Sequence, residues 1–135
     1  MATVSLVQYE NASPDVRAVF DDIKRTRNVK DVNNFWKALA NQPATLKRTW
    51  ESVREVMQPG ALDPLTKEMV YVAVSVANNC DYCIHSHTAA AFAKGMTQEQ
   101  YAELLAVIGM ASETNALANA MKIPVDPQYL AEAKK

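Results

Sequence analysis

The sequence predicts an all-α fold, and three features of its 135 residues support this prediction. Glycine occurs only 3 times, whereas all-β domains need glycine for many tight turns. Apolar residues recur at the i, i+3, i+4, i+7 spacing of one helix face. Cap residues followed by proline, which begin helices, precede two of these stretches. The length fits one domain, so we expect residues 1–135 to form a single-domain helical bundle.

Three helices are predicted in the first half of the chain. Ser13-Pro14 begins the first, and a polar break at residues 28–33 follows it. A short second helix ends before Pro43, and a third runs from Ala44 to the stop at Pro59-Gly60. Their apolar stripes are Val16, Val19, Phe20 and Ile23; Phe35, Trp36 and Leu39; and Leu46, Trp50, Val53 and Met57.

Residues 65–78 and 80–94 are predicted to form an antiparallel helix pair around the turn Asn78-Asn79. Asp63-Pro64 provides the cap and first-turn proline of the first helix, and Gly95 stands where the second needs a C-terminal cap glycine. Valines at every second position from 70 to 76 also fit a strand. The residues between them are largely apolar too, so the run has no polar face, and its cap and length favour a helix.

The remaining chain is also predicted to be helical. Thr97 and Gln100 match a capping box, and an apolar stripe follows, made of Tyr101, Leu104, Leu105 and Ile108. Gly109 indicates either a break or a close helix contact before a further helix at residues 110–121. Tyr129 and Leu130 are expected to anchor a last short turn.

Composition excludes several classes of function. A formal net charge of -1 with scattered basic residues gives no reason to expect nucleic-acid binding. The longest mostly apolar run, residues 69–77, is far shorter than the roughly 20 residues that span a bilayer. We expect no membrane association, and without a targeting segment the default location is cytoplasmic. The two cysteines are only three residues apart, which is too close for the disulfide framework of a small secreted protein.

The segment 79–87 carries the candidate chemistry. On a helix at about 100° per residue, Cys80, Cys83 and His87 fall within a sector roughly 60° wide, whereas His85 lies about 140° from Cys80. The cysteines also stand at the predicted helix start, where unpaired N–H groups favour a thiolate, the reactive form of cysteine. His87, one turn from Cys83, is placed to accept a thiol proton or to stabilise the resulting charge.

Glu68 is a candidate partner of His87. In an antiparallel pair that turns at Asn79, positions whose numbers sum to about 155–158 face each other, which brings Glu68 close to His87. A carboxylate there would orient the imidazole and raise its basicity. The alternative is an exposed first-turn carboxylate that only interacts with the helix dipole.

Two other roles for the cysteines remain open at this point. Cys80, Cys83 and His87 could ligate zinc, with Glu68 as a fourth ligand, although structural zinc sites usually have a second Cys or His pair. The cysteines could also be small buried hydrophobes. Their spacing and placement favour a redox or catalytic role.

Glu68, Cys80, Cys83 and His87 match the E-x11-C-x-x-C-x3-H signature of alkylhydroperoxidase D (AhpD)-like proteins. These proteins belong to the carboxymuconolactone decarboxylase superfamily. The resemblance extends from about residue 35 to residue 123 and includes Pro59-Gly60-Ala61-Leu62 and Asn115-Ala116-Leu117-Ala118-Asn119-Ala120. The chain departs from the archetypal members at Tyr82, where they carry a histidine.

The resemblance implies an all-helical fold that assembles into homo-oligomers, often trimers or hexamers. It also implies hydroperoxide reduction, with Cys83 as the attacking thiolate, Cys80 as the resolving thiol, and Glu68 and His87 as a proton relay. An external dithiol, such as a lipoyl group or a thioredoxin-like protein, would restore the thiols; no cofactor or metal is implied. The alternatives are a lactone-acting decarboxylase of the same superfamily and a non-enzymatic redox sensor or metal-binding module. Tyr82 bears on the range of substrates.

Overall fold

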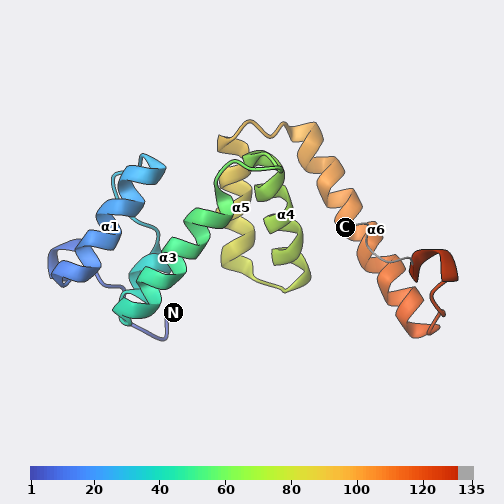
Figure 1. Ribbon diagram of the computed structural model, residues 1–135, viewed down its shortest axis with the longest axis horizontal. Coiled ribbons are helices and arrows are strands. Elements are labelled where there is room, and N and C mark those ends of the chain that lie inside the picture. Colours follow the sequence, from blue (N-terminus) through green and yellow to red (C-terminus); the bar gives the residue numbers. More distant parts are fainter. Residues whose placement is uncertain (131–135) are drawn as a thin grey trace. The chain divides into compact units, whose positions relative to one another are not determined.

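The computed structural model describes residues 1–130, which contain six α-helices and no strand, so the all-α prediction is confirmed (Figure 1). Two short 3-10 turns lie at Tyr9–Asn11 and Pro127–Leu130, the second where a last turn was predicted. The helices are α1 (Pro14–Arg27), α2 (Asn34–Leu39), α3 (Pro43–Met57), α4 (Pro64–Ala77), α5 (Asp81–Ala93) and α6 (Gln98–Ala120).

The chain divides into two compact units, residues 1–58 and the part that begins at Pro59. The first holds α1 to α3, and the second holds α4 to α6. That residues 1–135 form one domain stays a prediction, and its last five residues lie outside those described.

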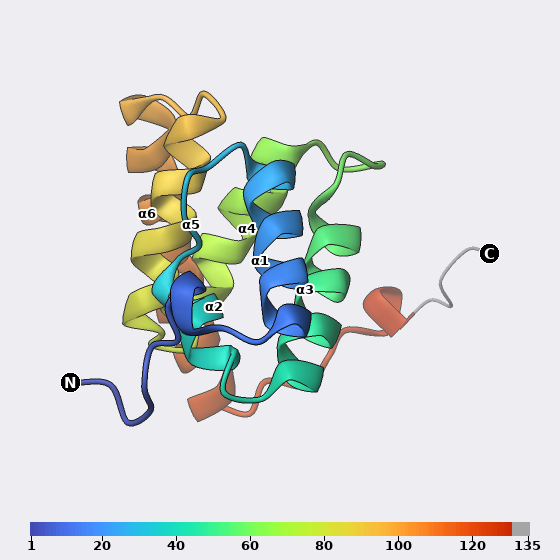
Figure 2. The same cartoon turned by 90° about the vertical axis from the view of Figure 1, so that its left-hand side faces the viewer.

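The first unit is built on the predicted apolar stripes. Helices α1 and α2 both pack on α3, and α1 and α3 run side by side (Figure 2). Trp36 and Trp50 meet edge to face, with ring centroids 5.5 Å apart. The buried residues supplied by the three helices include Val16, Phe20, Ile23, Trp36, Leu46 and Trp50.

The second unit contains the predicted helix pair. Asp63 caps α4 by accepting a 2.9 Å hydrogen bond from the Thr66 N–H, so the valine-rich run begins as a helix and continues to Ala77. Asn79 has a left-handed backbone (φ 56°), which asparagine adopts more readily than most residues, and this turns the chain. The N–H of Cys80 then donates to the Ser75 carbonyl at 2.9 Å. Both predicted helices are correct to within one residue at each end.

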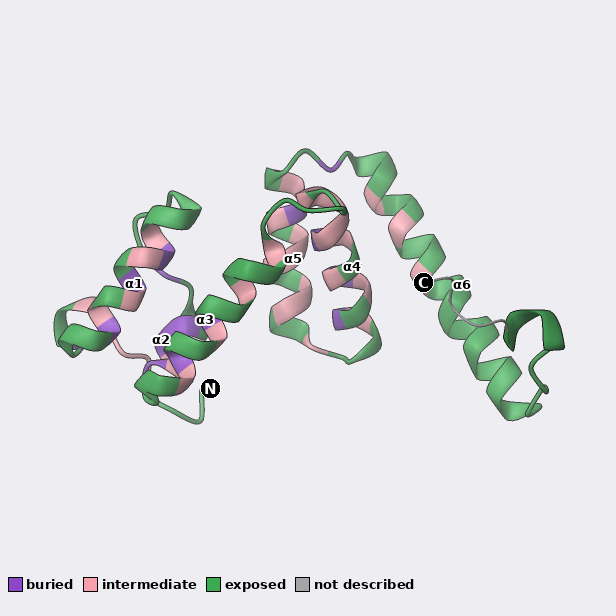
Figure 3. Cartoon of the chain, in the orientation of Figure 1, coloured by how far each residue is buried: buried purple, intermediate pink, exposed green. Residues whose placement is uncertain are grey.

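Helix α6 corrects one prediction. Thr97 and Gln100 form the predicted capping box, but the helix continues through Gly109 without a break, and nothing lies close to that glycine. Glycine costs only about 1 kcal/mol in a helix interior, which the unbroken backbone hydrogen bonding on both sides outweighs. Every described residue from Gly109 onward is exposed (Figure 3).

The helices found within residues 1–130 include none that combines the length and the apolar character needed to cross a membrane.

Candidate active site

The two cysteines lie at the start of α5 and are joined as a disulfide, with their Cα atoms 5.3 Å apart. Cys80 is the N-cap residue of the helix. Its Sγ atom accepts a 3.3 Å hydrogen bond from the Cys83 N–H. Backbone N–H groups at a helix start stabilise negative charge, and a thiolate formed here gains from them. The position therefore suits thiol-disulfide chemistry.

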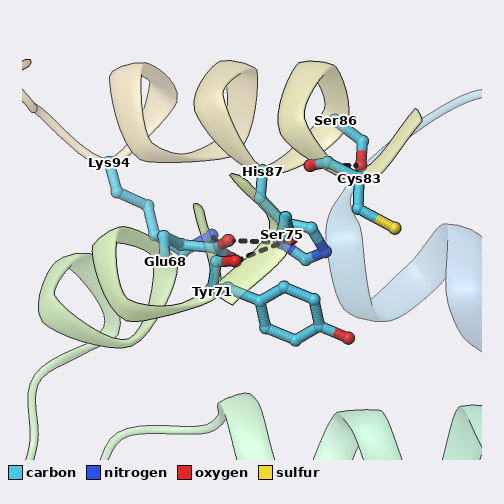
Figure 4. Close-up of polar contacts among 7 residues, drawn as sticks. All are labelled: Glu68, Tyr71, Ser75, Cys83, Ser86, His87 and Lys94. Atoms are coloured by element: carbon cyan, nitrogen blue, oxygen red, sulfur yellow. Dashed lines mark hydrogen bonds and ion pairs between the residues drawn. The ribbon is translucent and has the colours of Figure 1, made fainter. Parts of the chain in front are cut away.

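Glu68 and His87 meet across the helix pair, as the antiparallel arrangement predicts. The Nδ1 atom of His87 lies 2.7 Å from Oε2 of Glu68 (Figure 4). The Glu68 side chain is only 7% exposed and that of His87 17% exposed. The alternative interpretation of Glu68 as an exposed first-turn carboxylate is therefore wrong.

Lys94 is a third member of this group, and it is absent from the site residues predicted from the sequence. Its Nζ atom lies 3.2 Å from Oε1 of Glu68, so the carboxylate holds one partner on each oxygen. A signal was present, because Lys94 follows His87 by seven residues. Two helical turns return a side chain to almost the same face.

The charge state of Glu68 follows from these contacts. Burial raises the pKa of its carboxyl, but the hydrogen bond from His87 and the charge of Lys94 outweigh burial, and the net pKa lies below the usual value. Glu68 is therefore ionised at neutral pH and can only accept a hydrogen bond, so we infer that Nδ1 of His87 carries a proton. In the neutral ring, Nε2 then has the lone pair of a general base.

Tyr71 fixes the plane of the imidazole. The two rings are stacked, with centroids 3.6 Å apart and planes 18° from parallel. Figure 4 shows the Tyr71 ring beside His87, whose outer nitrogen is turned towards the Cys83 end of α5. Ser75, one turn further along α4, is buried and donates to the Tyr71 carbonyl at 2.7 Å. Neither residue was predicted, because both were counted with the apolar or neutral residues of α4.

His85 lies apart from this group. The His85 side chain is 81% exposed and stands 3.7 Å from Asp81 on the same helix. The prediction that His85 lies off the cysteine face is therefore confirmed. Tyr82, between the cysteines, is 42% exposed.

Metal binding gains no support from the arrangement of these side chains. Within residues 1–130, no three His, Cys, Asp or Glu side chains are grouped so that they could hold an ion. Glu68, the fourth ligand in the zinc alternative, is engaged by His87 and Lys94.

An all-helical fold with a CxxC pair beside a glutamate–histidine contact defines the AhpD-like class. Residues 43–126, more than half of the chain, match the Carboxymuconolactone decarboxylase family. The chain therefore belongs to the carboxymuconolactone decarboxylase family.

The chain is also similar to one solved structure and to two curated proteins. The chain is similar to the crystal structure of the alkylhydroperoxidase AhpD core from Rhodospirillum rubrum, with 61% identity, a TM-score of 0.94, and coverage of 98% of this chain and 99% of that one. It is also 35% identical over 78 residues to an uncharacterised protein of Cupriavidus necator, covering 57% of this chain and 69% of that protein. Uncharacterised protein 4 of the cox locus of Paracoccus denitrificans is 37% identical over 67 residues, which cover 50% of this chain and 60% of that protein.

Proposed function

We propose that this protein is a thiol-dependent peroxidase that reduces hydroperoxides through Cys80 and Cys83. The observation that carries the proposal is the contact of Glu68 with His87 on the helix that begins with the cysteine pair. A paired thiol with an oriented base beside it has the parts needed for nucleophilic attack. The similarity to a structure described as an alkylhydroperoxidase supports the same conclusion.

The first chemical step would use Cys83 as the nucleophile. His87 takes the proton of the Cys83 thiol through Nε2, and the thiolate attacks the distal oxygen of the hydroperoxide. The O–O bond breaks, Cys83 becomes a sulfenic acid, and the alkoxide leaves as an alcohol after receiving the proton from His87. Glu68 stabilises the transient imidazolium through the existing Nδ1 contact.

Cys80 would complete the cycle as the resolving thiol. The Cys80 thiol loses its proton, and its thiolate, favoured by the helix start, attacks the sulfenic sulfur of Cys83. The S–S bond forms as the S–O bond breaks, and the leaving hydroxide takes up one proton and departs as water. An external dithiol then exchanges with the disulfide, restores both thiols and leaves as its own disulfide. A lipoyl group or a thioredoxin-like protein has this chemistry. A cytoplasmic location, which we also propose, would place the protein where such dithiols are kept reduced.

A turnover assay tests this proposal. The reduced protein should consume an alkyl hydroperoxide continuously in the presence of dihydrolipoamide or reduced thioredoxin, with one dithiol oxidised for each hydroperoxide reduced. A carboxymuconolactone substrate in parallel tests the decarboxylase alternative, for which the cysteine pair has no evident use. Turnover of the lactone that survives alkylation of both cysteines, without peroxide turnover, would refute the proposal.

We also propose that the chain assembles into a homo-oligomer, with a trimer or a hexamer as the expected form. The second unit buries few side chains, and most of its exposed large apolar residues lie on α4, on α6 and beyond it. So much exposed apolar surface is unusual for a stable monomer and typical of an interface. These exposed residues include Val70, Val74, Leu105, Val107, Met110, Leu117, Met121, Ile123 and Val125.

Light scattering should therefore give a mass several times 14.9 kDa at micromolar concentration. Placing a charge on the exposed part of α6, as in Leu117→Asp, should lower that mass, because an unpaired charge is costly in an apolar interface. Asn119→Asp is the matched control, because Asn119 is also exposed on α6 but lies about 200° around the helix from Leu117, and the change adds the same charge. A wild-type protein that stays monomeric would contradict the assembly.

A further inference from the structure

Lys94 contacts the carboxylate oxygen of Glu68 that His87 does not contact. Its Nζ atom is 3.2 Å from Oε1, while His87 Nδ1 is 2.7 Å from Oε2. Lys94 reaches this carboxylate from the C-terminal end of α5, at the far end of the helix from the cysteines. The carboxylate is 7% exposed, whereas the lysine side chain is 40% exposed.

We propose that Lys94 is a positioning residue of the redox site, which keeps Glu68 ionised and oriented so that His87 serves the cysteine thiols as a base. The proposal rests on the proposed function of Cys80 and Cys83. It extends the site beyond the four residues of the family signature, to a lysine about two turns further along the helix from His87.

The charges around Glu68 explain why a cation is needed there. In residues 1–130, the charged or titratable side chains that contact Glu68 include His87, on α5, and Lys94, the C-cap residue of α5. Tyr71, on Glu68's own helix, stacks on His87, and no ion pair joins α6 to this group in the part of the chain described. Burial raises the pKa of the Glu68 carboxyl, and the hydrogen bond from His87 lowers it. Lys94, whose Nζ atom contacts the other carboxylate oxygen, lowers it further through its charge and its hydrogen bond.

A simpler role for Lys94 is the general one of a basic residue at a helix end. A cation there interacts favourably with the helix dipole and with the last carbonyl groups, whatever Glu68 does. That role would change the stability of α5 but would not depend on Glu68 or on its protonation. The two roles therefore predict different responses to pH and to loss of the carboxylate.

The experiment uses the full chain with Lys94→Met, Lys94→Gln and Lys94→Arg, and with Lys47→Met as a control at an exposed lysine of α3. Carboxyl 13C NMR on the oxidised protein follows the titration of Glu68, assigned by comparison with Glu68→Gln. The rate of thiol alkylation against pH is measured on the reduced protein. Both neutral variants should raise the pKa of Glu68, and Lys94→Arg and Lys47→Met should leave it near the wild-type value.

The alkylation rate of Lys94→Met should fall about 2- to 5-fold on the acidic side of the profile, the effect expected of a partly exposed ion pair, and change little on the alkaline side. In a Glu68→Gln background the same substitution should have no further effect. An unchanged Glu68 titration in both neutral variants, or an equal loss of rate in both backgrounds, would overturn the positioning role. Failure of the proposed function is distinguishable, because the protein would then lack peroxide turnover while the titration of Glu68 still reported on Lys94.

Discussion

Replacing Glu68 with glutamine, or His87 with alanine, should slow the reaction of the Cys83 thiol with hydroperoxide by about 10- to 10⁴-fold, where about 10²- to 10⁴-fold is the full contribution typical of a general acid–base group. The same variants should slow alkylation of the thiol. Each variant removes one of the two partners in the 2.7 Å contact between Glu68 and His87, and this contact makes Nε2 of His87 a base. Stopped-flow measurement of peroxide consumption by the reduced protein gives the rates.

The decreases in reaction rate caused by Glu68→Gln and by His87→Ala should not be additive. A double variant should react about as slowly as the slower single variant, because the members of one relay fail together. His85→Ala is the matched control, since His85 lies on the same helix but is 81% exposed and away from Glu68. Thiol reactivity that Glu68→Gln leaves unchanged across pH would show that Glu68 only supports the helix pair.

Substituting the cysteines one at a time should separate their roles. Cys83→Ser should abolish the reaction with hydroperoxide, since the thiolate is the nucleophile and a serine hydroxyl cannot form a sulfenic acid. Cys80→Ser should still react once, and should stop with a sulfenic acid on Cys83, because no second thiol remains to form the disulfide. Mass spectrometry would detect the added oxygen, and a sulfenic acid trapping reagent would locate it.

The opposite outcome is also informative. Cys80 caps α5 and its sulfur already accepts the Cys83 N–H, which favours negative charge on Cys80. If Cys80→Ser abolishes the reaction and Cys83→Ser retains it, then Cys80 is the attacking thiol. In that case the N–H groups at the helix start activate a thiol more strongly than the nearby His87 does.

The helix pair and its main contact could be predicted from local features of the sequence. Asp63-Pro64 and the turn at Asn79 set where α4 and α5 begin and end, which fixes their register. Once the register is known, helix geometry brings Glu68 to His87 without further information. The proximity is confirmed, whereas the catalytic roles of the four signature residues stay predictions.

Other parts of the site depend on tertiary contacts that a sequence pattern does not report. Lys94 resembles any lysine near a helix end until Glu68 is found buried within its reach. Tyr71 counts as one more apolar position of α4 until its ring is found parallel to His87. The break or close contact predicted at Gly109 is wrong because the prediction relied on local propensity. The continuous hydrogen bonding of α6 overrides that propensity.

Counting thiols before and after addition of one equivalent of hydroperoxide tests the central claim most directly. The fully reduced chain should show two alkylatable cysteines, and after one equivalent it should show none, with a single Cys80–Cys83 disulfide found by mass spectrometry and one alcohol released. A chain that still shows two alkylatable thiols after exposure to hydroperoxide would contradict the dithiol mechanism.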